Sequence, residues 1–230
     1  MSQLSRFGGL SDLTPVVKNL LLLNILVFIA CWLYPNLTDY LAMYYPSNPA
    51  FEPWQIITHM FTHGGFFHIF FNMYALYSFG SLLEHERVLG SKRFATLYLF
   101  SGLGAIAFHL AINAITAWNI TGSPVIDYEQ AVANETLASI YFSGGGGASG
   151  AIYGLLAGFG YLFPHTPLMV LFIPVPIKAK YMIPLVIIAY DIAFAQVGLD
   201  NVAHYAHIGG AIFGFLLVLF WNKTNRSNFF

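Results

Sequence analysis

Six apolar runs constrain the fold of this chain more than any other feature. They cover residues 18–35, 67–84, 92–116, 149–164, 179–197 and 203–221. A helix needs about 20 apolar residues to cross the hydrocarbon core of a bilayer, so 230 residues have room for six spans and no second, soluble domain. Only 8% of the residues are charged, against about 25% in a soluble globular domain. We therefore expect an all-α membrane protein with six transmembrane helices in one domain over residues 1–230.

The basic residues predict how these spans are oriented. If the N-terminus is inside, the inner segments hold all nine Lys and Arg residues: Arg6, Lys18, Arg87, Lys92, Arg93, Lys178, Lys180, Lys223 and Arg226. The outer segments hold only acidic ones: Asp39, Glu52, Asp127, Glu129, Glu135 and Asp200. This satisfies the positive-inside rule, so both termini are expected to be cytoplasmic.

Net charge, cysteine content and the first apolar run limit the binding partners, the disulfides and the N-terminal processing that we expect. The net charge of −1 argues against nucleic acid as a partner, and the lipid bilayer is the expected surrounding. Cys31 is the single cysteine, so no intrachain disulfide can form. The first apolar run lacks a small-residue cleavage site and is interpreted as a retained helix rather than a signal peptide. Residues 117–148 are expected to form a long loop that ends in the glycine run 144–147.

The orientation has a consequence for chemistry, because the second, fourth and sixth spans would all run from outside to inside. His68 lies near the start of the second run, Ser149 opens the fourth, and His207 lies four residues into the sixth. At 1.5 Å per residue, all three should lie within about 10 Å of the outer boundary. Three polar groups at one depth on three helices could form one site.

Ser149 is the candidate nucleophile. A serine hydroxyl becomes a good nucleophile only when a base such as histidine can take its proton. At the start of a helix, after a glycine-rich loop, it would also lie near free backbone N–H groups and the positive end of the helix dipole. Gly147 and Gly150 would let the backbone bend there and let another chain approach closely. The alternative is a serine N-cap or a small packing residue.

Small residues predict how a base could approach Ser149. Glycine recurs at every fourth position in the fourth and sixth runs: Gly150, Gly154 and Gly158 in one, Gly210 and Gly214 in the other. Such stripes let two helices pack closely, and His207, one turn before Gly210, would lie near the same face. An ionisable residue in a membrane span is a functional candidate by default, although His207 could instead bond between helices. His204, one turn earlier, is interpreted as structural.

The second run opens with a further polar cluster. His68 and Asn72 are four residues apart and so share one helix face. An amide that faces the site could donate to a developing oxyanion, or it could merely bond across helices. A metal site formed by His59, His63 and His68 is a further alternative. No carboxylate or cysteine joins these histidines at ligand spacing, so no metal and no other cofactor is expected.

Two acidic residues in the apolar runs have different expected roles. Glu84 lies twelve residues beyond Asn72, near the inner end of the second run. We interpret it as an anchor to backbone amides, either of the segment 36–66 or of a neighbouring helix end. Asp191 in the fifth run could orient His207, but nothing in the spacing requires it, and a Ser–His dyad is the simpler interpretation.

Taken in order, these motifs resemble the rhomboid family of intramembrane serine proteases. They are WQIITHMFTH at 54–63, His68 with Asn72, GASG at 147–150, and AHIGG at 206–210 followed by Gly214. The resemblance covers about residues 52–221, and the ordered set is far more specific than any one motif. One departure is the stretch from Glu84 to Gly90, two residues longer than the family's acidic-to-glycine spacing. It leaves open which of Glu84 and Glu86 takes the acidic position.

The resemblance implies a role for each site residue. Ser149 would be the nucleophile and His207 the general base, while His68 and Asn72 would assist the oxyanion. Tyr153, four residues after Ser149, resembles the tyrosine on which the family's catalytic histidine stacks.

The resemblance also implies a fold and a reaction. Six spans with both ends inside resemble the bacterial form of the rhomboid bundle, so a bacterial inner (plasma) membrane is expected. We expect a serine endopeptidase that cleaves transmembrane protein substrates near the outer face, the substrate entering between helices two and five. The alternative is a catalytically inactive relative that binds membrane clients. A solute transporter would favour inverted repeats, and none is evident. The natural substrate and the oligomeric state are not readable from the sequence.

Overall fold

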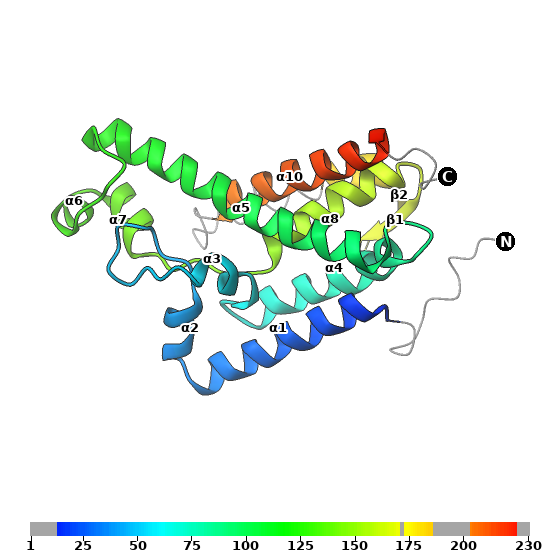
Figure 1. Ribbon diagram of the computed structural model, residues 1–230, viewed down its shortest axis with the longest axis horizontal. Helices are drawn as coiled ribbons and strands as arrows, with labels where there is room; N and C mark the ends of the chain where they lie inside the picture. Colours follow the sequence, from blue (N-terminus) through cyan, green and yellow to red (C-terminus); the bar gives the residue numbers. More distant parts are fainter. Residues whose placement is uncertain (1–12, 171–172, 186–202, 225–230) are drawn as a thin grey trace.

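The computed structural model describes residues 13–170, 173–185 and 203–224, and within them the chain is an α-helical bundle (Figure 1). Among the described residues, four helices are long and apolar enough to cross a membrane. They are α1 (Pro15–Leu33), α4 (Phe66–Glu84), α5 (Gly90–Thr121) and α10 (Ala203–Thr224). They match the first, second, third and sixth predicted runs, so the prediction of a multi-pass helical membrane protein is confirmed to this extent.

The fourth and fifth predicted runs differ from the other four. The fourth run forms α8 (Ser149–Leu162), an apolar helix of 14 residues. In the fifth run, residues 179–185 are helical, and the rest of it, with Asp191, lies outside the described residues. The helices α4, α8 and α10 run in the same direction, whereas α1 and α5 run in the opposite one (Figure 1). The end of the bundle at which α1 begins is therefore also the end at which α10 finishes.

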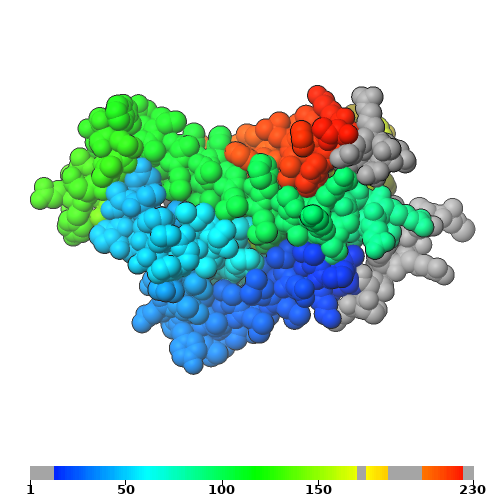
Figure 2. Space-filling model, viewed as in Figure 1, coloured from blue at the N-terminus to red at the C-terminus, as the bar shows by residue number. Residues whose placement is uncertain are grey.

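Between α1 and α4, short helical segments lie at the opposite end of the bundle. These are α2 (Asn36–Leu41), α3 (Gln55–Thr58) and the 3₁₀ turn η3 (His59–Phe61). In the space-filling view this segment (blue to cyan) covers the surface between α1 and the far part of α5 (Figure 2).

The prediction of a loop over residues 117–148 is wrong in part. The helix α5 continues to Thr121, and α6 (Tyr128–Ala133) and α7 (Glu135–Phe142) follow. Each short helix is started by a side-chain cap: Asp127 accepts from the backbone N–H of Gln130 at 2.7 Å, and Asn134 accepts from two backbone N–H groups of α7. Helices of six and eight residues show too little of the 3.6-residue apolar period to be detected without their caps.

A β-hairpin that the sequence analysis did not anticipate follows α8. Strand β1 (Pro167–Val170) pairs antiparallel with β2 (Ile173–Lys178), and Leu168 is opposite Ile177. Leu168 packs against the main apolar core, which includes the fully buried side chains of Leu76, Phe94 and Leu155.

The glycine stripes of α8 and α10 are in contact, as predicted. A Cβ atom at Gly210 would collide with the backbone oxygen of Gly150, and a Cβ atom at Gly214 would collide with the Cα atom of Gly154. Backbone therefore packs directly on backbone at two successive turns, which no larger residue would allow. The predicted packing of these two helices is confirmed.

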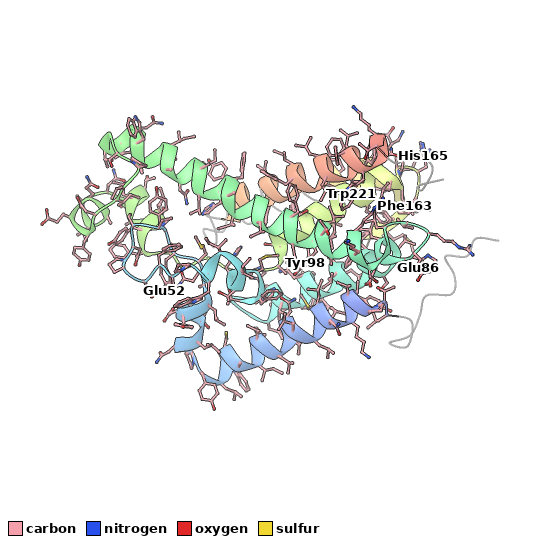
Figure 3. All side chains as sticks on the ribbon, viewed as in Figure 1. Glu52, Glu86, Tyr98, Phe163, His165 and Trp221 are labelled. Atoms are coloured by element: carbon pink, nitrogen blue, oxygen red, sulfur yellow. The ribbon has the colours of Figure 1, made fainter. Side chains whose placement is uncertain are left out.

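Glu84 anchors the start of α1. Its carboxylate accepts the backbone N–H groups of Val16 and Val17, both at 2.9 Å, and the hydroxyl of Ser91 at 2.6 Å. These amides belong to the first turn of α1, whose N–H groups have no intrahelical acceptor. The interpretation of Glu84 as an anchor to a neighbouring helix end is thus confirmed. Glu86, the other acidic residue of this stretch, is exposed at the end of the bundle (Figure 3).

Candidate active site

The hydroxyl of Ser149 and the ring of His207 are within hydrogen-bond distance. Oγ of Ser149 lies 2.9 Å from Nε2 of His207, although 58 positions separate the two residues in the chain. Ser149 is the first residue of α8, where Ala148 takes the N-cap position. The N-cap alternative for Ser149 therefore does not hold. A histidine nitrogen at this distance can take the proton of the hydroxyl.

The ring of Tyr153 stacks on the imidazole ring of His207. Its ring lies parallel to that of His207, with centroids 4.2 Å apart and an interplanar angle of 11°. Tyr153 is one turn after Ser149 on the same face of α8, so one helix carries both the hydroxyl and the surface against which the imidazole packs. Both Tyr153 and His207 are buried, and this limits the orientations that the ring can adopt.

The glycine run before Ser149 is fixed against the segment that precedes α4. Gly145 and Met43 exchange two backbone hydrogen bonds, of 2.7 and 2.9 Å, and the N–H of Gly147 donates to the carbonyl of His59 at 2.7 Å. Gly147 has φ of +145°, a backbone conformation that favours glycine. The run therefore enters α8 in a defined path, and the first N–H groups of that helix have no intrahelical acceptor.

His68 lies beside this glycine run. A Cβ atom built at Gly147 would be 2.9 Å from Nε2 of His68 and 3.5 Å from Oγ of Ser149. The imidazole of His68 and the hydroxyl of Ser149 thus flank the same small volume, where a carbonyl oxygen of a bound peptide could accept a hydrogen bond.

Asn72 lies one turn deeper. Its Nδ2 donates to the carbonyl of His68 at 2.8 Å, which engages one of its two amide hydrogens. The cavity described below is lined by His68 but not by Asn72. The predicted oxyanion role of Asn72 therefore depends on its second hydrogen or on a rotation of the amide.

A cavity of about 310 Å³ opens over Ser149. It is bounded by the glycine run 144–147, by Ile140 of α7, and by His109 and Asn113 of α5. Nδ2 of Asn113 lies 2.9 Å from Nε2 of His109, and both side chains are buried. The sequence analysis missed this pair. The available signal was a polar i, i+4 pair in an otherwise apolar run, because ionisable residues in such runs are functional candidates.

Two histidines that precede α4 have lowered pKa values. Burial and the neighbouring His68 ring lower the pKa of His63 to about 4, and burial lowers the pKa of His59. His59 and His63 are four residues apart, but within the described part of the chain no three His, Cys, Asp or Glu side chains meet as a metal site requires.

Comparisons with known proteins show which family this chain resembles over its length. A family model described as the Rhomboid domain matches residues 50–223. Rhomboid protein 1, mitochondrial, of Saccharomyces cerevisiae is 30% identical over 211 residues, which cover 91% of this chain and 54% of that protein. The presenilin-associated rhomboid-like protein, mitochondrial, of Homo sapiens is 30% identical over 226 residues, covering 96% and 52%. RHOMBOID-like protein 12, mitochondrial, of Arabidopsis thaliana is 29% identical over 228 residues, covering 96% and 61%. The chain spans about half the length of the curated relatives it matches.

Proposed function

This chain belongs to the rhomboid family, as its ordered motifs indicated, and we propose that it is an intramembrane serine endopeptidase with a Ser149–His207 dyad. The observation that carries the proposal is the 2.9 Å approach of the Ser149 hydroxyl to the His207 imidazole. Its support is the stacked Tyr153 ring and the cavity that opens over the hydroxyl. The substrates are transmembrane proteins, cut near the outer face of the bilayer.

In this mechanism the Ser149 oxygen attacks the scissile carbonyl carbon while His207 Nε2 takes the hydroxyl proton. Collapse of the tetrahedral intermediate breaks the C–N bond. His207 returns the proton to the leaving amine, and an acyl-enzyme remains. Water, activated by His207, then attacks the ester carbonyl, and its proton passes back through the imidazole to the Ser149 oxygen. The serine and the histidine are restored, and the new carboxyl end is released.

The negative charge of the intermediate needs hydrogen-bond donors that are already in place. We assign this role to His68, to Asn72 and to the first backbone N–H groups of α8. The closeness of His68 to Gly147 and Ser149 supports its part. The helix dipole adds to the effect, because the N-terminus of α8 points at the reacting oxygen.

We propose that the six apolar runs form one membrane domain over residues 1–230 with both termini on the basic side. The common direction of α4, α8 and α10 supports this topology. The sequence analysis expected a bacterial inner membrane. We revise this expectation because the named relatives are mitochondrial rhomboid proteins. They indicate a mitochondrial rather than a bacterial membrane. In a Cys31→Ala background, labelling of single cysteines introduced at Ser123 and at Lys223 should mark opposite sides of sealed vesicles, and labelling from the same side would refute the topology.

The decisive test of the activity combines a covalent probe with mutagenesis. A fluorophosphonate should label the purified protein at Ser149, and neither Ser149→Ala nor His207→Ala should be labelled. Each variant should lose cleavage of a single-span substrate by a factor on the order of a million, and the double variant should be hardly worse, because the two groups act as a unit. Asn72→Ala and His68→Ala should each cost roughly 100- to 1,000-fold if they donate to the oxyanion.

The same experiment distinguishes the enzyme from the client-binding alternative. A non-catalytic relative would bind transmembrane proteins equally well in wild type and in Ser149→Ala, and neither would be labelled. Additive losses from the two single variants, or turnover in Ser149→Ala near that of wild type, would contradict the dyad. Circular dichroism must first show that each variant is folded, since buried polar groups also hold helices together.

A further inference from the structure

The β-hairpin at the end of α8 has exposed apolar side chains that the proposed catalysis does not use. Leu168 and Ile177 are paired and partly buried. By contrast, Met169 is 69% exposed and Val175 is 56% exposed. In water, a two-stranded sheet of this kind is only marginally stable. The exposed apolar side chains indicate that part of the hairpin surface is not in water.

Cations and an aromatic ring lie at the last residue of β2 and directly after it. Lys178 and Lys180 are exposed, and so is Tyr181, whose ring centroid lies 4.8 Å from Nζ of Lys180. Backbone hydrogen bonds from Ala179 to Thr166 and from Lys180 to Pro164 tie this segment to the end of α8. Apolar, aromatic and basic side chains next to one another are typical of the boundary between hydrocarbon and headgroups.

The end of the bundle at which the hairpin lies is strongly basic. Here α4, α8 and α10 end and α1 and α5 begin (Figure 1). The first turns of α1 and α5 and the last turn of α10 contribute exposed Lys18, Lys92 and Lys223. Among the described residues at this end, Glu86 is the one exposed carboxylate, because Glu84 is buried against α1. The hairpin therefore faces its surroundings in a field that attracts anions.

Two independent estimates give the depth of the hairpin. Each strand of a two-stranded sheet has one unpaired edge, and hydrocarbon cannot satisfy its N–H and C=O groups, so the hairpin cannot lie below the headgroups. The helix α8 has 14 residues and is therefore about 21 Å long. With Ser149 at the deep limit of the expected range, about 10 Å below the outer boundary, the end of α8 reaches the opposite boundary of a hydrocarbon core about 30 Å thick.

We propose that the hairpin formed by β1 and β2, with Lys178 and Lys180, binds the phosphate headgroups of anionic lipids in the leaflet on the basic side. Its apolar side chains Met169 and Val175 enter the upper part of the acyl region, and the two ammonium groups neutralise headgroup phosphates. The contact holds the inner end of α8 at the membrane boundary, and the rigid helix sets the depth of Ser149 at its other end. The inference rests on the proposed topology and not on the proposed proteolysis.

The test measures where the hairpin lies. Met169→Cys in a Cys31→Ala background carries an environment-sensitive fluorophore, and the protein is reconstituted into phosphatidylcholine vesicles with or without phosphatidylglycerol. A spin label on the lipid headgroup should quench the fluorophore more than a label near the end of the acyl chain. Spin-labelled phosphatidylglycerol should quench it at a lower mole fraction than spin-labelled phosphatidylcholine.

Two pairs of substitutions with the same change in charge test the lysines. Lys178→Gln with Lys180→Gln should raise the phosphatidylglycerol fraction needed for half-maximal quenching by about fivefold per lysine, from about 1 kcal/mol for each cation at a membrane surface. The control pair Lys92→Gln with Lys223→Gln, on other helices of the same end, should change it far less.

Several results would overturn the proposal. One such result is quenching that does not depend on the phosphatidylglycerol content of the vesicles. Another is that the two pairs of lysine substitutions change the quenching equally, and a third is that only an aqueous quencher reaches the fluorophore. Displacement of the lipid by inorganic phosphate would show a site for free anions instead. The measurement is repeated with Ser149→Ala and must give the same result, so its outcome is independent of whether the protein is a protease.

Discussion

Gly210→Ala should impair the proposed activity by adding a single methyl group away from the side chains of the proposed Ser149–His207 dyad. The new Cβ would lie 2.8 Å from the carbonyl carbon of Gly150 and closer still to its oxygen, whereas ordinary contact begins at 3.4 Å. The obstacle is backbone and cannot rotate away, so α8 and α10 must separate by on the order of 1 Å. This would lengthen the 2.9 Å contact of Ser149 with His207 to about 3.9 Å, beyond a hydrogen bond.

We expect a loss of on the order of 100-fold in kcat/KM, since displacements of 1 Å between reacting groups have effects of this size. Overpacking should also lower the free energy of unfolding by about 1–3 kcal/mol. The assay is cleavage of a single-span substrate in detergent, with thermal unfolding of the same sample. Gly158→Ala is the matched control in the same helix interface, because its Cβ would meet side-chain ends of Val218 and Leu97 at 3.1 and 3.4 Å. A Gly210→Ala protein as active and as stable as Gly158→Ala would refute the reasoning.

Three further predictions follow from the same contacts. Tyr153→Phe should keep most activity while Tyr153→Ala should lose about tenfold or more, because Phe retains a ring that can stack on His207 and Ala does not. Equal losses in cleavage assays would contradict this. Glu84→Gln should lower the free energy of unfolding by about 1–3 kcal/mol, since an acceptor of two α1 amides is replaced in part by a donor, whereas thermal unfolding of the exposed Glu86→Gln should match wild type. The pKa of His63 falls to about 4 on folding, so between pH 6.5 and pH 4 the unfolded state binds a proton that the folded state does not. The free energy of unfolding should therefore fall by about 2 kcal/mol from pH 7 to pH 5. Thermal unfolding of His63→Gln at the two pH values should lack this part of the pH dependence.

Local sequence was sufficient for the parts of the fold that depend on pattern alone. Apolar runs of the length of a bilayer predict spans because hydrocarbon cannot satisfy an open backbone, and α1, α4, α5 and α10 lie where such runs predict them. Shorter elements were missed. The helices α6 and α7 depend on caps at Asp127 and Asn134, and the β-hairpin depends on packing of Leu168 against a core built by distant helices.

The candidate site divides in the same way. Ser149, His207 and His68 could be named as candidates from motifs, and the glycine stripes predicted that α8 and α10 would meet, because each of these signals is carried by spacing within a single helix. Tyr153 was named only through the resemblance to the rhomboid family. The sequence could not predict the contacts that depend on distances between helices. Only the tertiary structure decided that Asn72 bonds to its own helix, that Glu84 reaches α1, and that His109 joins the cavity over the serine. The physical reason is that spacing within one helix determines which side chains lie on the same face of that helix. The partner of a side chain on another helix depends on how all the helices pack together.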